Sequence, residues 1–180
     1  MQHVDIADPY IHEPKGASTA TAGQLYIANG AGSGVWTAPV YGEKKIEGNA
    51  LTFTPVAADI AQFKKLASTG WTSGQASGVT LNTDDITLTT AGIYEVCFWS
   101  SISTSAATGT KFAVKYALDG STATRKMTTQ KNSSGADYIT ISASGIVSAT
   151  AGQVLAIYMA SSAATAFTVE DAGLYVVKLK

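Results

Sequence analysis

The sequence has few of the side chains that carry most enzyme chemistry: 180 residues include two histidines and one cysteine. His3 and His12 lie near the N-terminus, before the β-rich part of the chain begins. Cys97 lies in the apolar run EVCFW, which is typical of a small core residue. A serine triad requires a buried histidine, a cysteine nucleophile requires an adjacent base, and a zinc site requires several ligands. We therefore predict no catalytic, cofactor-binding or metal site and no enzymatic activity.

Charge is also scarce, because only 14% of the residues are charged, against about 25% in typical soluble domains. The formal net charge is −1 and no block of Lys or Arg is present, which excludes the basic footprint of a nucleic-acid-binding protein. A surface this poor in charge indicates that part of it is covered by partners.

Long apolar runs are absent too. No stretch approaches the ~20 residues of a membrane helix, so no membrane partner is expected. The first ten residues, MQHVDIADPY, lack the basic and apolar regions of a secretory signal. A single cysteine excludes an intrachain disulfide. These features predict a chain that is synthesised and folded in a cytoplasm.

Carboxylates and aromatic residues leave two alternatives open. The pairs Asp84–Asp85 and Glu170–Asp171 would suit Ca²⁺ together with turn carbonyls, although no DxDxDG loop is present and most carboxylates lie beside turns. A sugar-binding face would need exposed aromatic rings. The candidates are Trp71, Trp99, Tyr116, Tyr138 and Tyr158. Their alternating positions in expected strands favour core and interface packing instead.

Residues 1–45 are expected to form an extended, mostly irregular arm. Pro9, Pro14 and Pro39 break any helix. The GAGSG at 30–34 has GxGxG spacing and no lysine follows it until Lys44, so a flexible turn is favoured over a phosphate loop. Only QLYIA (24–28) resembles a strand. Such a segment buries too little surface to offset ~1–2 kcal/mol of backbone ordering per residue, so we expect it to dock on a partner. The predicted anchoring residues are His12, Pro14, Leu25, Tyr26, Ile27 and Trp36.

Residues 46–180 predict an antiparallel β-sandwich, because short β-branched and aromatic runs alternate with turn residues. The expected strands are 51–56, 79–83, 86–89, 93–103, 111–118, 123–130, 138–149, 153–161, 166–170 and 174–180. One segment, DIAQFKKLA (59–67), has the spacing of a helix but would also suit a strand. The turns LDGS and NSSGAD separate neighbouring strands.

A recurring Ala-Gly pair precedes several apolar runs, in TATAGQLYIA (19–28), TTAGIYEV (89–96), ATAGQVLAIY (149–158) and EDAGLYVV (170–177). We expect each glycine to turn the chain at positive φ just before a strand begins.

The expected strand over 93–103 contains IYEVCFWSS, which is apolar on both faces. A strand that faces water on one side should alternate, so a loop or another subunit must cover the second face. The predicted trimer-interface residues are Tyr94, Val96, Phe98, Tyr158 and Tyr175.

The second half of the chain resembles the trimeric jelly-roll heads of the tumour-necrosis-factor/complement-C1q type. The residues that carry the resemblance are DDITLTTAGIYEVCFWSSIS (84–103), KFAVKYALDGS (111–121), SGIVSATAGQVLAIYMASS (144–162) and FTVEDAGLYVVKLK (167–180). The pattern departs at Gly152–Gln153, where Gly-Asp is usual. The resemblance implies an all-β, antiparallel jelly-roll sandwich and a homotrimer.

The segment HEPKGASTATAGQLYIANGAGSGVW (12–36) resembles the openings of tailed-bacteriophage virion proteins, especially head decoration proteins and head fibres. This resemblance implies a capsid decoration or cement protein that binds the major capsid protein through its arm, at the capsid surface of a virion assembled in a bacterial cytoplasm. The alternative is the receptor- or glycan-binding head of a phage tail fibre or spike, with a host-surface glycan as partner.

Overall fold

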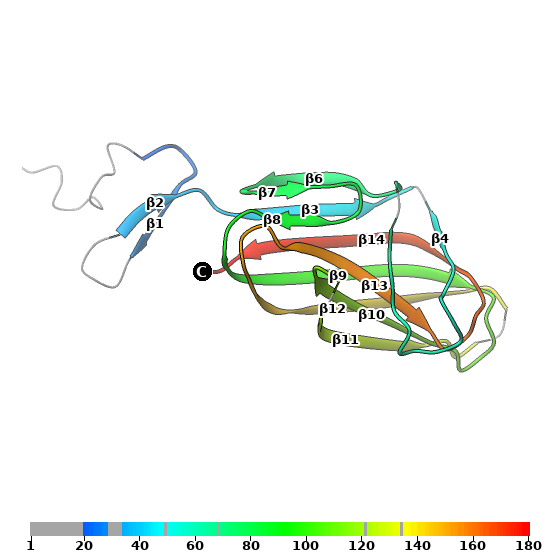
Figure 1. The fold of residues 1–180 in the computed structure, drawn as a ribbon. Coiled ribbons are helices and arrows are strands. Elements are labelled where there is room, and N and C mark those ends of the chain that lie inside the picture. The colour runs from blue at the N-terminus through cyan, green and yellow to red at the C-terminus, as the bar shows by residue number, and fades with distance from the viewer. Residues whose placement is uncertain (1–19, 29–33, 49, 68, 121, 134) are drawn as a thin grey trace, which may run out of the picture. The chain divides into compact units, whose positions relative to one another are not determined.

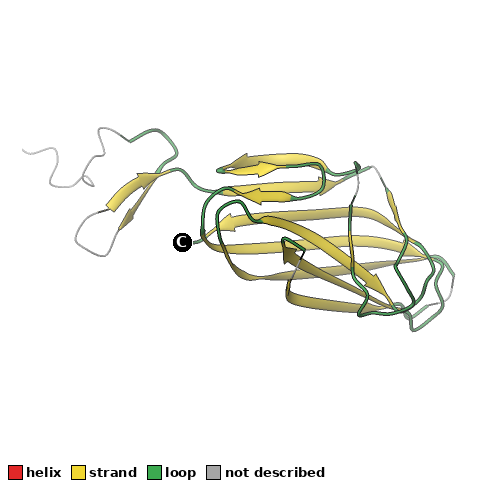
Figure 2. Cartoon of the chain, viewed as in Figure 1, coloured by secondary structure: helices red, strands yellow, loops and turns green. Residues whose placement is uncertain are grey.

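The computed structural model describes residues 20–28, 34–48, 50–67, 69–120, 122–133 and 135–180. These residues form strands and loops without a helix, as Figure 2 shows. They belong to two units, residues 1–39 and 40–180, which are described separately. The all-β prediction is therefore confirmed. Strand β3 (Tyr41–Ile46) pairs with the last strand of the sandwich, so the second unit begins at Val40 rather than at residue 46.

The second unit is a jelly roll of two antiparallel sheets (Figure 1). The first sheet has the order β12-β9-β14-β3-β6, with β4 also paired to β14. Its strands are β12 (Asp137–Ala149), β9 (Gly92–Thr104), β14 (Phe167–Lys178), β3, β6 (Thr72–Ser77) and β4 (Leu51–Phe53). The second sheet has the order β11-β10-β13-β8-β7, with β5 also paired to β13. Its strands are β11 (Thr122–Gln130), β10 (Lys111–Leu118), β13 (Val154–Ser161), β8 (Ile86–Leu88), β7 (Val79–Leu81) and β5 (Lys64–Lys65).

The core lies between the two sheets and comes from alternate positions of their central strands. From β10, Phe112, Val114 and Tyr116 are buried, as the alternation in KFAVKYAL predicts. The Phe167 ring of β14 contacts Phe53 and Phe112, with ring centroids 5.0 and 5.2 Å apart. Ala113 and Ala117 on the opposite side of β10 are buried too, so β10 is covered on both sides at these positions.

The structure decides one open alternative among the expected elements and corrects one boundary. Residues 59–67, which suited a helix or a strand, form a turn in which Gln62 N donates to Asp59 O, followed by the short strand β5. The expected strands 166–170 and 174–180 are one strand, β14, whose pairing with β9 shifts register between Val169 and Asp171. A β-bulge at this point keeps the ladder continuous, and Glu170 within it accepts a hydrogen bond from Ser103 Oγ.

The Ala-Gly pairs have two different structural roles. Gly23 and Gly152 both have φ of +87°, and each turn is closed by a glutamine: Gln24 Oε1 accepts from Thr21 N at 2.7 Å, and Gln153 Oε1 accepts from Thr150 N at 2.9 Å. Gly92 and Gly173 instead lie within β9 and β14 without positive φ. The predicted turn is thus correct at two pairs and wrong at the other two, where a side chain would collide with a neighbour.

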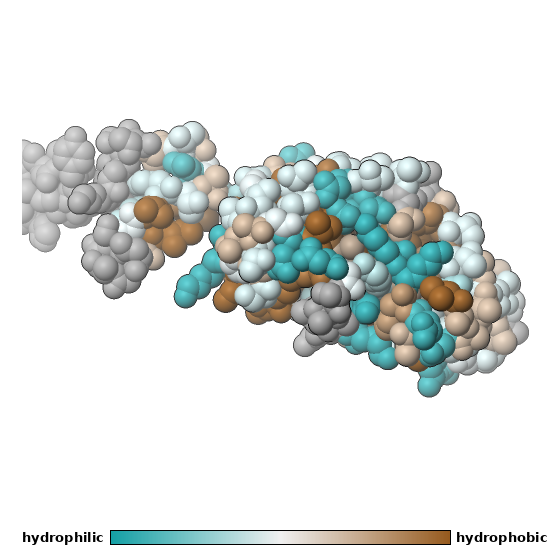
Figure 3. All heavy atoms as spheres, viewed as in Figure 1, coloured by the Kyte–Doolittle hydropathy of each residue, from teal (hydrophilic) through white to brown (hydrophobic). Residues whose placement is uncertain are grey.

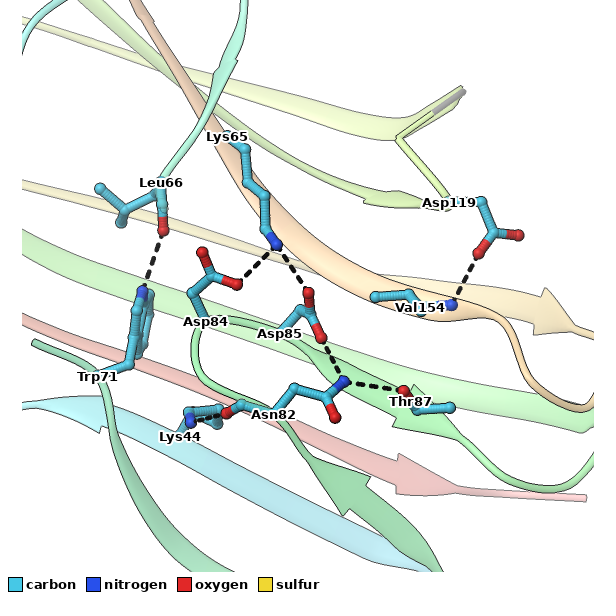
Figure 4. Close-up of polar contacts among 10 residues, drawn as sticks. All are labelled: Lys44, Lys65, Leu66, Trp71, Asn82, Asp84, Asp85, Thr87, Asp119 and Val154. Carbon is cyan, nitrogen blue, oxygen red and sulfur yellow. Dashed lines mark hydrogen bonds and ion pairs between the residues drawn. The ribbon is translucent and has the colours of Figure 1, made fainter. Parts of the chain in front are cut away.

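Charged residues link β5 to the turn between β7 and β8 (Figure 4). Lys65 Nζ lies 2.7 Å from Asp84 Oδ1 and 2.7 Å from Asp85 Oδ2. Burial disfavours ionised Asp85, but hydrogen bonds from Lys65 and Asn82 outweigh it and lower the pKa of Asp85. Lys44 is buried and donates to Asn82 O, and this burial lowers its pKa. The pair Asp84–Asp85 therefore holds an ammonium group where the sequence left Ca²⁺ open.

Candidate subunit-contact face

The outer face of the first sheet carries a continuous set of exposed side chains from four strands. Strand register places them in three rows across β12, β9, β14 and β3. The first row is Ile146, Glu95, Val177 and Tyr41. The second row is Ser144, Cys97, Tyr175 and Glu43. The third row is Ser142, Trp99, Gly173 and Lys45. We call these three rows, with Ile93 beyond the first, the outer face.

The outer face is unusually apolar for a solvent-facing sheet surface. The exposed fractions of its large apolar side chains run from 37% for Tyr41 and Val177 to 65% for Ile146. The members are Tyr41, Ile93, Trp99, Ile146, Tyr175 and Val177. By contrast, Figure 3 shows apolar patches of the sandwich that are small and lie among polar residues on the side turned to the viewer. Large apolar side chains gathered on one exposed sheet face are typical of an interaction surface.

The indole of Trp99 packs against the backbone of β14 at Gly173, where no side chain is in the way. A Cβ added at Gly173 would meet Trp99 Nε1 and would lie only 2.7 Å from Cε2 and 3.0 Å from Cζ2 of the same ring. Any side chain at this position would therefore lift the indole away from the sheet. The Ala172–Gly173 pair thus shapes the outer face instead of turning the chain.

We predict that Gly173→Ala moves Trp99 while leaving the fold intact, because the backbone at this position is extended and tolerates alanine. The indole should become more exposed, which a red shift of its fluorescence and stronger acrylamide quenching would report. Trp71 is buried and donates to Leu66 O at 3.1 Å, so measurements in a Trp36→Phe background would isolate Trp99. An unchanged spectrum would contradict the close packing.

A hollow of about 310 Å³ adjoins Trp99 on the outer face. Its lining includes Cys97, Trp99, Met127, Ser142, Ser144 and Tyr175. Met127 belongs to β11, so the edge of the second sheet contributes to this surface. A hydrogen bond with the Cys97 thiol, reinforced by partial burial and by the charge of Glu95, raises the pKa of Tyr175. The phenol therefore stays neutral and remains a hydrogen-bond donor at neutral pH.

Four of the five predicted interface residues lie away from the outer face. Tyr94, Val96 and Phe98 are buried in the core of their own subunit and do not belong to the outer face. Tyr158 lies half-buried on β13 of the second sheet, under the ammonium of Lys115 at 5.6 Å from the ring centroid. Only Tyr175 belongs to the outer face. The sequence showed that both sides of this strand are apolar, but gave no sign of which side faces the second sheet.

The other aromatic residues considered for a sugar-binding face lie in two different environments. Trp71 and Tyr116 are buried in the core. Tyr138, on β12 opposite Ser103, is 73% exposed.

The described residues contain no group of three or more histidine, cysteine or acidic side chains suited to a metal ion. Among these residues we also find no helix that is long and apolar enough to span a membrane.

In the first unit, β1 (Leu25–Ala28) and β2 (Gly34–Thr37) form an antiparallel hairpin. The predicted anchors Tyr26 and Trp36 are cross-strand partners whose rings pack 5.3 Å apart. Leu25, Ile27 and Val35 project from the other face and are more than half exposed. Figure 3 shows this hydrophobic patch on the hairpin. His12, Pro14 and most of the GAGSG segment lie outside the described residues.

The chain has a jelly-roll fold of the tumour-necrosis-factor type. Compared with solved structures, it matches Eiger TNF from S. frugiperda with a TM-score of 0.58 and 14% identity over 79% of this chain and 93% of that chain. Murine APRIL matches with TM-scores of 0.48 at pH 5.0 and 0.49 at pH 8.0, at 14% identity, over 78% and 77% of this chain and 99% of that chain. No family model and no curated protein matches the sequence. The similarity shows the fold, as the sequence resemblance implied.

Proposed function

We propose that this chain is a structural protein that assembles as a homotrimer through the outer face. The observation that carries the proposal is the set of six large apolar side chains, each at least 37% exposed, on the outer face of β12, β9, β14 and β3. A free monomer would leave this surface in water, whereas an obligate interface resembles a core cut in half. In a closed cyclic assembly every copy can bury this surface against its neighbours.

We further propose that the trimer is a capsid decoration protein of a tailed phage, with the first unit as the anchor to the shell. An isolated two-stranded hairpin is marginally stable in water, and this one exposes Leu25, Ile27 and Val35 on one face. A partner surface would cover these side chains, which favours an anchoring role. Binding to the assembled shell but not to free capsid subunits would stabilise the shell by mass action.

The experiment removes residues 1–39 and compares the truncated and full chains. Sedimentation velocity measures the oligomer, and pelleting with undecorated capsids measures shell binding. We expect the truncated chain to remain trimeric, because the outer face lies in residues 40–180, and to lose shell binding. Retained shell binding would exclude the anchoring role, and a monomeric full chain would exclude the trimer.

A matched variant tests the hairpin surface without deleting it. Leu25→Ser with Ile27→Thr removes exposed apolar groups from one strand, whereas the cross-strand Tyr26–Trp36 contact remains. Weaker shell binding by this variant, with the trimer unchanged, would place the contact on that face.

A receptor- or glycan-binding head is the second candidate. The observation that favours it is Tyr138, an aromatic ring 73% exposed near the loop in which Ser133 Oγ donates to Asp137 Oδ2 at 2.6 Å. Binding of the truncated trimer to host cells or to a glycan array, abolished by Tyr138→Ala, would favour this role over decoration.

A further inference from the structure

Glu95 is the one carboxylate in the first row of the outer face, and apolar groups surround it. Its neighbours on the same side of β9 are Ile93 and Cys97, and its register partners are Ile146 on β12 and Val177 on β14. Ile93, Ile146 and Val177 are themselves among the exposed apolar side chains of the face. A contact that covers these three must also take Glu95 out of water.

No cationic side chain on the outer face is placed to compensate Glu95. On β3 the second row carries Glu43, and Lys45 in the third row forms an ion pair with Glu47 at 2.8 Å. On β14 the titratable neighbour is Tyr175, whereas Lys178 turns to the other side, with Nζ 3.4 Å from Thr90 Oγ1. On β12 the facing residues are Ser144, Ile146 and Ser148, and on β9 the remaining titratable group is Cys97.

We propose that Glu95 makes subunit association proton-linked, so that the homotrimer tightens as the pH falls toward 5. The inference rests on the proposed trimer and names its regulation. Burying an ionised carboxylate without a partner costs several kcal/mol, whereas the protonated acid is neutral and can donate a hydrogen bond.

The sign follows from linkage. A glutamate that loses water on assembly binds its proton more tightly in the trimer than in the free subunit. Assembly then takes up protons, is favoured below the trimer's titration point and is weakened as the pH rises through it. The ion pairs of Lys65 do not obscure this effect. The pKa of Asp85 is lowered in the folded chain. The stabilisation that ionised Asp85 gives to the fold is therefore lost only as the pH falls below the usual titration range of an aspartate, which is more acidic than the range of the test.

The raised pKa of Tyr175 agrees with this electrostatic environment. The hydrogen bond with Cys97 is its main cause, and the nearby charge of Glu95 also contributes. Both groups therefore lie within interaction range of the phenol on the outer face. A neutral Tyr175 and a protonated Glu95 would leave this part of the contact without net charge.

The test measures trimer dissociation by analytical ultracentrifugation between pH 5 and pH 8 at constant ionic strength. The wild-type chain should bind several-fold more tightly per subunit at pH 5 than at pH 8, because protonation removes the charge that assembly would otherwise dehydrate. Glu95→Gln should be about tenfold tighter per subunit than wild type at pH 8, and nearly independent of pH. Glu47→Gln, which removes a carboxylate just after β3 and outside the three rows, is the matched control and should keep the wild-type pH profile.

Two results would overturn the inference while leaving the trimer standing. One is a Glu95→Gln trimer that is weaker than wild type at pH 8, because a cation of the neighbouring subunit would then pair with Glu95. The other is a Glu95→Gln trimer with the wild-type pH profile. A wild-type chain that stays monomeric from pH 5 to pH 8 would instead overturn the proposed trimer, and the inference with it.

Discussion

Val177→Asp should convert the proposed trimer into monomers without unfolding the subunit. Val177 lies in the first row of the outer face, paired in register with Glu95 on β9 and with Tyr41 on β3. An aspartate here places a second carboxylate beside Glu95 in a surface that assembly would dehydrate. An unpaired buried charge costs about 3–5 kcal/mol, which weakens each contact by at least about two powers of ten. Sedimentation velocity would show the change from trimer to monomer at micromolar concentration.

The control for this prediction is Val56→Asp, at a more exposed valine in the loop after β4. It adds the same charge away from the outer face, so the oligomeric state should not change. Circular dichroism should show the same β spectrum for both variants, because Val177 is 37% exposed and its neighbour Val176 fills the core. If Val177→Asp remained trimeric, the contact would have to lie on another surface.

Lys131→Met should lower the free energy of unfolding by about 3–5 kcal/mol, the largest effect on stability that we expect from a single substitution. Lys131 is fully buried, and its ammonium donates to Thr104 O at 3.1 Å, to Ala106 O at 2.6 Å and to Gly135 O. Methionine keeps most of the volume but leaves three carbonyls without this donor. Each hydrogen bond to a charged group contributes about 1.5–3 kcal/mol. Chemical denaturation monitored by circular dichroism would measure the loss.

Lys126→Met is the matched control, because Lys126 is an exposed lysine on the neighbouring strand β11. Its effect should stay within about 0.5 kcal/mol, as for most surface substitutions. Equal stability of the two variants would mean that the buried ammonium gains no more from the carbonyls than from water. Because Lys131 joins the segments around Thr104 and Gly135, the loss should also loosen the end of the sandwich that carries Tyr138.

The local sequence pattern was sufficient to predict a strand and its bounds where one side of the strand is apolar and the other is not. Strand β10 (Lys111–Leu118) has the predicted bounds, and the Asp-Gly turn that follows has positive φ at both Asp119 and Gly120. The pattern was insufficient to predict β3 as a strand, because its sequence YGEKKI has little apolar alternation. Buried Lys44 occupies a core-facing position there through its hydrogen bond to Asn82 O. Such a position cannot be recognised without the loop that supplies the acceptor.

The sequence by itself determined that the chain is an antiparallel β protein with a low-charge N-terminal segment, because strand spacing, turn residues and composition are local properties. It also determined that β9 is apolar on both sides. Only the tertiary structure decided which side is the core and which is the outer face. Alternation has a period of two residues, so exchanging the two sides preserves the pattern. The choice is made by packing, in which Tyr94, Val96 and Phe98 meet the second sheet and Glu95, Cys97 and Trp99 are left facing outward.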